Sequence, residues 1–147
     1  MRGHVEHPER PAGPPVHGRF GSHRGLAVAS ALTRAISSEI AALYALVYGH
    51  DRTTATTYIN DNVVLCVLEN ILTEHEATLI DTGSSAVVID GRVAFQTDTQ
   101  DEFTAAVERL THRRVVAFMS ANQTAPGVAA ELFFLDATPL AVAASLA

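Results

Sequence analysis

The feature that most constrains the fold is VVLCVL, the run Val63–Leu68, in which every side chain is apolar. Its length and its β-branched residues are typical of a buried strand. Since successive strand side chains point to opposite faces, this strand needs apolar cover on both faces of its sheet. Helices of the same chain can cover one face. We expect a second copy to cover the other, and therefore predict a homodimer.

The segment before this run predicts a helix and a hairpin. Apolar residues recur at spacings of three and four, which predicts a helix over 26–48 that Gly49 ends. The sequence TTATTYI is rich in residues that favour extended structure, and Asn60-Asp61 suits a tight turn. Together with the apolar run, these residues predict a hairpin over 54–69.

The segment after the run begins with a helix signal. Thr73 and Glu76 have the spacing of a capping box, in which each side chain binds the backbone N–H of the other residue. This pair predicts a short helix over 73–81.

The next segment, 84–96, fits two structures. Its apolar residues flank Asp90-Gly91, a pair typical of a hairpin turn. The same residues also fit a helix that tolerates Gly91, at a cost of about 1 kcal/mol relative to alanine. The local pattern alone favours the hairpin.

The stretch Asp101–Leu135 predicts a helix followed by a second hairpin. DEFTAAVERLTHR has the spacing of an amphipathic helix, and the apolar segments VVAFM and VAAELFFL flank the polar loop SANQTAPG. We expect strands at 114–120 and 129–135.

Composition indicates one domain with a terminal extension at each end. The chain has 147 residues, enough for a single hydrophobic core. Residues 1–24 are rich in proline and glycine and lack a signal-peptide pattern, so we predict a disordered arm. Its histidines are compatible with metal binding, but a solvated tail explains them more simply. We predict a folded domain over 25–137 and an apolar tail over 138–147.

Charge and cysteine content narrow the functional classes. The formal net charge of −6 argues against nonspecific nucleic-acid binding, which depends on neutralising phosphates. No apolar run reaches the roughly 20 residues of a transmembrane helix. The single cysteine, Cys66, excludes an intramolecular disulfide and fits a cytoplasmic location.

Two blocks of the sequence resemble the MpsC-like family of bacterial proteins in order and spacing. They are ISSEIAALYALVYGHDRTTATTYINDNVVLCVLENILTEHEATL and DEFTAAVERLTHRRVVAFMSANQTAPGVAAELFFL. The resemblance runs from Ile36 to Asp136 and implies a helix over 84–111, where relatives have an Arg-rich helical sequence. The family is named after a sodium-translocating, membrane-potential-generating system. The resemblance thus implies an association with cation or bicarbonate transport. The last loop of relatives carries two acidic residues and a histidine that are absent from SANQTAPG in this chain.

With that helix, the predicted fold is an α+β two-layer sandwich. A four-stranded, mainly antiparallel sheet carries helices on one face, in the order α-β-β-α-α-β-β.

Candidate binding residues gather near the end of the predicted long helix and in the loop that follows. Arginine and histidine there either balance the helix C-terminus or form an anion-binding patch, because guanidinium groups bind carboxylate and phosphate with two hydrogen bonds. Hydroxyl and amide groups of the polar loop suit a binding rim. The candidate ligand- or partner-binding residues are Arg109, His112, Arg113, Arg114, Ser120 and Asn122.

Other motifs have simpler explanations. His75-Glu76 lacks the second histidine of a HExxH zinc motif, since Leu79 occupies that position. His50-Asp51 could poise a general base, but charged loops after helices are common. We therefore predict no catalytic residues, no metal site and no cofactor.

The sequence thus favours a non-enzymatic binding or regulatory module. We expect it to act beside a cation or bicarbonate transport system, with a membrane transport protein as partner. The alternative is a small anion-binding protein or enzyme that uses Arg113 and Arg114.

Overall fold

A computed structural model of the chain describes residues 23–139. Within that range the chain forms three helices and four strands in the order α-β-β-α-α-β-β, which confirms the predicted α+β fold. The elements are α1 (His23–Tyr48), β1 (Thr54–Asn60), β2 (Val63–Glu69), α2 (Glu74–Asp81), α3 (Ser85–Thr111), β3 (Arg113–Thr124) and β4 (Gly127–Pro139). The described elements extend slightly beyond the predicted 25–137 domain. The rest of the predicted arm and tail lies outside the described residues.

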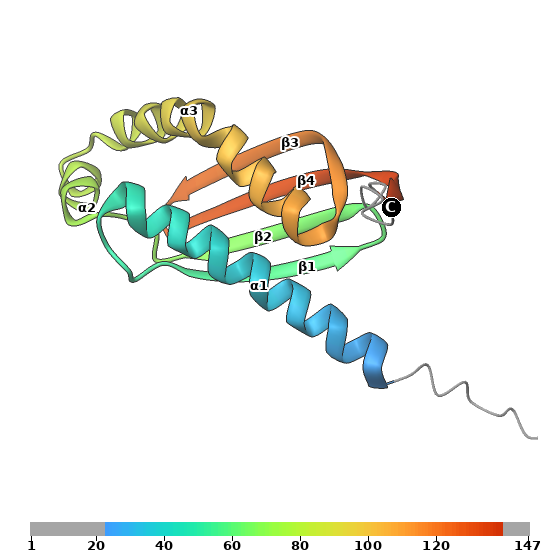
Figure 1. The fold of residues 1–147 in the computed structure, drawn as a ribbon. Helices are drawn as coiled ribbons and strands as arrows, with labels where there is room; N and C mark the ends of the chain where they lie inside the picture. The colour runs from blue at the N-terminus through green and yellow to red at the C-terminus, as the bar shows by residue number, and fades with distance from the viewer. Residues whose placement is uncertain (1–22, 140–147) are drawn as a thin grey trace, which may run out of the picture.

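The strands form one antiparallel sheet in the order β1-β2-β4-β3. The last strand, β4, lies between β2 and β3, so the two hairpins join at the centre of the sheet. Both long helices, α1 and α3, lie across the same face, and α2 lies at one end (Figure 1). Among residues 23–139, no helix lies on the opposite face of the sheet.

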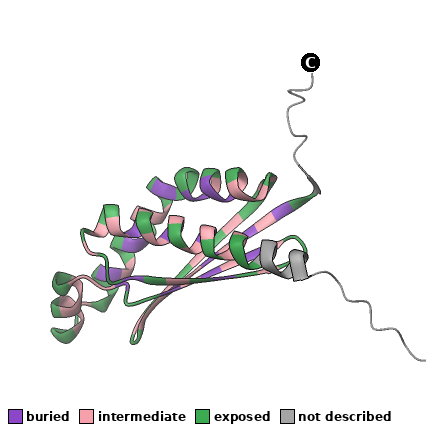
Figure 2. Cartoon of the chain, turned by 60° about the horizontal axis from the view of Figure 1, so that its bottom comes forward, coloured by how far each residue is buried: buried purple, intermediate pink, exposed green. Residues whose placement is uncertain are grey.

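The core fills the space between the helices and the covered face. Alternate residues of β2 are fully buried there: Val64, Cys66 and Leu68. Buried segments of helices and strands meet in this layer (Figure 2). The remaining core comes from the inner sides of α1, α3 and β4, and from the exit of β2, with Ile36, Ile40, Tyr44, Ile71, Phe103, Val107, Ala129, Phe133 and Leu135.

Residues 85–111 form one continuous helix, so the hairpin suggested by local pattern is wrong and the prediction from family resemblance is confirmed. Helical spacing places Val88, Arg92, Thr99 and Phe103 on the buried side. A hairpin turn at Gly91 would separate these side chains onto two strands. Tertiary packing therefore overrides the local preference. No helix within residues 23–139 is long and apolar enough to span a bilayer.

The C-terminal hairpin is longer than predicted. The residues expected to form a polar loop, Ser120–Thr124, continue β3, and only Ala125-Pro126 forms the turn. Ladder pairing runs to Thr124 and Gly127, and the side chains alternate between a covered and an exposed face. The loop prediction was wrong because polar composition concealed this period of two.

The two exposed glycines of the α2–α3 region offer a matched test of the helix. An added Cβ meets no atom within 4 Å at either Gly91 or Gly83, but Gly83 has φ +85° and Gly91 is helical. We expect Gly91→Ala to raise the free energy of unfolding by about 1 kcal/mol, because alanine loses less backbone entropy in a helix. Urea unfolding followed by circular dichroism measures this change.

Gly83→Ala is the control, and it should lower stability because an L-residue is strained at positive φ. If Gly91→Ala destabilised the protein as much as Gly83→Ala, residue 91 would not be helical.

Candidate functional site

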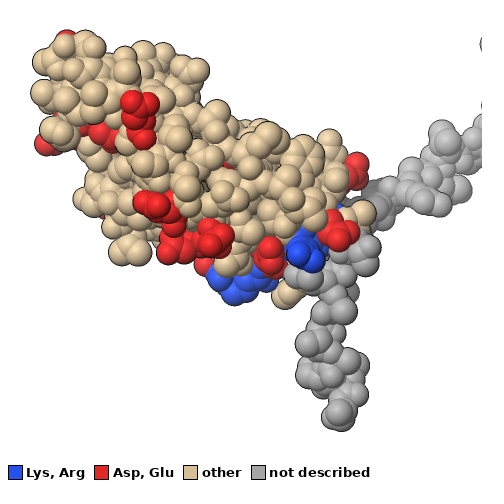
Figure 3. Space-filling view, turned by 90° about the horizontal axis from the view of Figure 1, so that it is seen from above, with Lys and Arg blue, Asp and Glu red and all other residues tan. Residues whose placement is uncertain are grey.

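The predicted basic patch is divided among separate structural contacts. Arg109 of α3 forms an ion pair with Glu39 of α1, so it joins the two long helices. His112 is exposed and caps α3 in the left-handed conformation, with φ 54°. Acidic groups spread along the surface seen from above, while the visible basic groups gather at one end (Figure 3).

Arg113 uses its guanidinium group to hold two other segments. Nε and Nη2 donate hydrogen bonds to the carbonyl oxygen of Asp136, at 3.0 and 2.8 Å. Nη1 donates to the carbonyl oxygen of Asp61, at 2.8 Å. Arg113 therefore ties the end of β4 to the β1–β2 turn. Its neighbour Arg114 is exposed.

Ser120 and Asn122 lie far from these arginines. They sit on the helix-covered side of β3, where Ser120 Oγ and Asn122 Oδ1 are buried. Arg113 begins the same strand, and seven residues of extended chain separate it from Ser120 by about 23 Å. The structure thus does not bring the six candidate residues into one site, and their binding roles remain predictions.

A different set of polar side chains meets beneath the helices, around Glu131 of β4. Glu131 is only 2% exposed, and Oε1 accepts a 2.6 Å hydrogen bond from the hydroxyl of Tyr44 on α1. Glu131 lies directly between Cys66 of β2 and Ser120 of β3 in the sheet register. One carboxyl group therefore contacts or adjoins three other elements at the centre of the fold.

A buried arginine lies close enough to this carboxyl group to act on its pKa. Arg92 of α3 is 2% exposed, and its Nε and Nη2 donate to the two carboxylate oxygens of Glu76 at 2.8 and 2.7 Å. Nη2 also donates to the carbonyl oxygen of Ile71, at 2.6 Å. The guanidinium carbon lies 4.2 Å from the ring centroid of Tyr48, a cation–π geometry. Arg92 thus connects α3 with α1, α2 and the exit of β2.

Burial and local charges shift the pKa values of this cluster. Burial raises the pKa of Tyr48 to about 12, and it raises the pKa of Tyr44 further, together with the charge of Glu131. Burial also raises the pKa of Glu131, although the hydrogen bond from Tyr44 and the nearby hydroxyl of Ser120 act in the opposite direction. For Glu76, burial is outweighed by hydrogen bonds from Arg92 and Thr73, which lower its pKa. The pKa values of the two carboxyl groups are therefore shifted in opposite directions, upward for Glu131 and downward for Glu76.

Cys66 is the buried cysteine that the sequence predicted. It is fully buried, and burial raises the pKa of its thiol to about 11. A thiol with so high a pKa is a poor nucleophile at neutral pH. Within residues 23–139, no group of three or more His, Cys, Asp and Glu residues is placed to hold a metal ion.

The loop between α1 and β1 does not form a histidine–aspartate pair. His50 Nδ1 accepts a hydrogen bond from the backbone N–H of Arg52, and Nε2 lies 3.4 Å from the carbonyl oxygen of Ile71. Both ring nitrogens therefore face backbone groups, which assigns the proton to Nε2.

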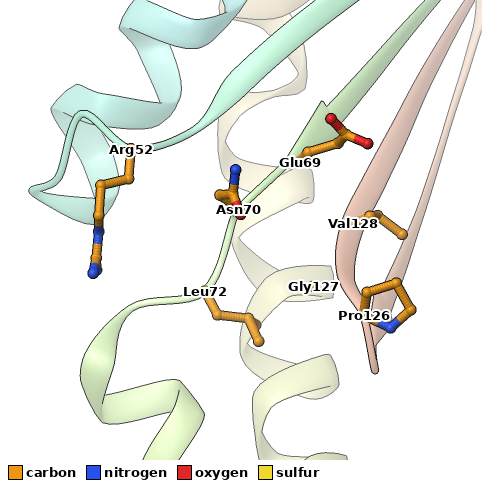
Figure 4. Close-up of a pocket in the computed structure, with 7 residues that line it drawn as sticks. All are labelled: Arg52, Glu69, Asn70, Leu72, Pro126, Gly127 and Val128. Atoms are coloured by element: carbon orange, nitrogen blue, oxygen red, sulfur yellow. The ribbon is translucent and has the colours of Figure 1, made fainter.

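A surface groove of about 710 Å³ opens at the same end of the sheet (Figure 4). Arg52 lines one side and Glu69 with Asn70 another, while the β3–β4 turn supplies an apolar wall. Arg52 and Glu69 point in different directions in this view, so they do not converge on one point. The groove floor is tightly built, since a Cβ at Gly127 would lie 2.7 Å from Leu72 Cγ.

The sequence contained signals for the cluster that local motifs did not reveal. Glu131 lies within VAAELFFL at an inward position, in register with Ala129, Phe133 and Leu135. A charged residue at an inward position of a strand is uncommon and needs a partner. Glu76 was predicted as a helix cap, which the structure confirms, but its ion pair with Arg92 was not foreseen.

The Arg92–Glu76 ion pair leads to a stability prediction. In Glu76→Gln, the side chain can still complete the capping box, but the buried guanidinium group loses its counter-charge. We expect the free energy of unfolding at neutral pH to fall by about 3 kcal/mol, the lower end of the range for breaking a buried ion pair. Chemical denaturation measures this difference.

The same variant has a defined pH dependence. Because the pKa of Glu76 is lowered in the folded state, its stabilisation exists above the unfolded pKa and is lost as pH falls through the folded pKa. Glu76→Gln should therefore lack this acid-dependent loss. Glu74→Gln changes an exposed carboxylate in the same turn and should behave like the unmodified protein.

Comparison with known proteins assigns the chain to one family. No curated protein and no solved structure matches the chain. One family model matches residues 29–137, which include all strands except the last residues of β4 and nearly all of the helical layer. Its description is "Na+-translocating membrane potential-generating system (MpsC)". The chain therefore belongs to the MpsC family.

Proposed function

We propose that the protein is a dimeric binding module that acts beside a membrane system for cation translocation. The family description supports the association with a Na+-translocating system. The observation that carries the binding role is the helix-free face of the sheet. This face has the apolar composition of an interface. A second copy docked on it would give the outward side chains of β2 their second cover.

Apolar side chains cross this face without interruption. The sheet register aligns Tyr58, Leu65, Leu132 and Met119 in one row across all four strands. The next rows add Val63, Phe134 and Ala117 on one side, and Val67, Ala130 and Ala121 on the other. Tyr58 and Met119 are 59% and 54% exposed, although both are large apolar residues. The centre of the face contains no charged side chain.

The dimensions of the face suit a reversible dimer. The strand rise of about 3.3 Å and spacing of about 4.8 Å give a footprint of about 20 by 20 Å, or about 400 Å². A contiguous apolar patch of about this size on a soluble domain often marks an interaction site. Two copies together cover about 800 Å² of footprint, which is below the roughly 1,200 Å² of a standard specific interface and therefore corresponds to a weak, reversible dimer.

The lack of central charge favours a second copy as the occupant. Two identical faces with no central charge stack without repulsion, and packed sheets reach a spacing of about 10 Å. A strongly charged partner would find no complementary group in the centre. The cytoplasmic location and the transport protein remain parts of this proposal.

The alternative anion-binding function has less support. Arg113 donates hydrogen bonds to the backbone of two segments, and Arg109 pairs with Glu39. An anion would have to compete with these contacts. Arg114 and His112 are the exposed basic side chains that remain at the junction between α3 and β3.

Substitution on the open face tests the dimer. The double variant Tyr58→Lys/Met119→Lys places two charges in the apolar row, where a partner sheet would desolvate them. We expect the dimer dissociation constant to rise at least about 30-fold, equivalent to about 2 kcal/mol. Sedimentation equilibrium over a concentration series measures this constant.

Val87→Lys/Val93→Lys is the matched control, because these valines are 59% and 53% exposed on α3. It should leave the dissociation constant unchanged. A monomer at all concentrations for the unmodified chain would contradict the dimer, and an equal effect of both double variants would place the interface elsewhere.

The association with a transport system needs a separate experiment. Crosslinking in the native membrane, followed by identification of the captured proteins, should recover a cation-transport protein. If the Tyr58→Lys/Met119→Lys variant no longer captures this protein, then docking requires the sheet face or the dimer that it forms. Crosslinks confined to proteins without a membrane span would contradict the proposed location.

A further inference from the structure

The cluster around Glu131 contains buried polar atoms that no protein group satisfies. Within residues 23–139, five buried side-chain atoms have no hydrogen-bond partner: Tyr48 Oη, Arg92 Nη1, Ser120 Oγ, Asn122 Oδ1 and Glu131 Oε2. They come from α1, α3, β3 and β4, and Tyr48 and Arg92 interact electrostatically with Glu131. Since native proteins leave few buried polar atoms unpaired, this concentration in one place requires a physical explanation.

Hydrogen-bond chemistry shows what the sheet side of the cluster lacks. The oxygen of the Asn122 amide is only an acceptor, and both oxygens of an ionised Glu131 are acceptors. Ser120 stands opposite Glu131, and Asn122 is its diagonal neighbour on the same face. The Ser120 hydroxyl has one donor, so it can donate a hydrogen bond to Glu131 or to Asn122, but not to both. A proton on Glu131 Oε2 changes that atom from an acceptor into a donor.

The charges of the cluster also favour a proton on Glu131. The ionisable groups that face Glu131 are Tyr44 and Tyr48 from α1, Arg92 from α3 and Cys66 from β2. Of these, Arg92 alone carries a charge at neutral pH. Its guanidinium is already matched by Glu76 of α2 through two hydrogen bonds. One cation thus serves two carboxyl groups, and an ionised Glu131 would leave a net negative charge in the core.

We propose that Glu131 is a proton-binding site whose proton helps to hold α1 and α3 against the sheet. The protonated carboxyl accepts from Tyr44 through Oε1 and donates through Oε2 toward the acceptors on β3. Ionisation removes this donor and leaves an unbalanced charge under both helices. The helix layer therefore docks less firmly when Glu131 loses its proton.

The pH dependence follows from the direction of the shift. Burial raises the pKa of Glu131 above its unfolded value. Its contribution to stability is complete below the unfolded pKa and is lost as pH rises through the folded pKa. Between the unfolded and the folded pKa, the folding equilibrium constant falls by up to about tenfold for each pH unit. This trend is opposite to that of Glu76.

The experiment compares unfolding equilibria of the full chain and Glu131→Gln from about pH 5 to about pH 9. Glutamine reproduces the shape of a protonated carboxyl and cannot ionise. We expect the stability of the unmodified chain to decline relative to Glu131→Gln as pH rises. Hydrogen exchange in peptides of α1 and α3 should accelerate over the same pH interval in the unmodified chain only.

Glu102→Gln is the control, because Glu102 is an exposed carboxylate on α3. Its stability profile should stay parallel to that of the unmodified chain. Parallel profiles for Glu131→Gln as well would overturn the proposal, because they would mean that Glu131 is ionised in the folded protein.

A second measurement decides the question if Glu131→Gln does not fold. The infrared carbonyl band of a protonated carboxyl group, recorded on the unmodified chain, should persist at a pH where surface carboxyls are ionised. Its loss on further increase of pH should accompany faster hydrogen exchange in α1 and α3. Absence of the band above the ordinary carboxyl range would overturn the proposal.

Discussion

The guanidinium group of Arg92 is the contact on which the helical layer depends. It carries the one buried positive charge described in the core, and it reaches the cap of α2, the backbone after β2 and the ring of Tyr48. Such a group is stable in the interior only when its charge and its donors are matched. The position of α2, the course of α3 and the ionisation of Glu76 all follow from this requirement.

The local patterns that predicted the fold were those in which one physical rule acted alone. The capping box at Thr73 and Glu76 fixed the start of α2, and the apolar period fixed α1. Prediction failed where two rules competed. Asp90-Gly91 favours a turn locally, but the burial of Val88 and Arg92 on one helical side decides the structure. Polar composition concealed the strand at Ser120–Thr124, because its alternation contains few apolar residues.

The polar cluster could not be assembled from the sequence for a related reason. Tyr44 and Glu131 are 87 positions apart, and their hydrogen bond exists only because β4 enters the sheet beside β2. In the sequence, Glu131 was visible as a charged residue at a position where strand alternation predicts an inward, apolar side chain. Its partners could be identified only from the order of the strands, which hydrophobic periodicity does not specify. The basic residues near 113 were conspicuous in the sequence, yet Arg113 serves mainly to fasten backbone segments.

The position of β4 also affects how the chain is made. During synthesis β2 emerges early, but its inner neighbour β4 is the last of the four described strands to leave the ribosome. Until then VVLCVL has an unpaired edge, and such edges of high β-propensity readily join other chains. The nascent protein therefore passes through an interval in which its future centre is exposed. Chaperone capture during that interval would favour a correctly completed sheet over aggregation.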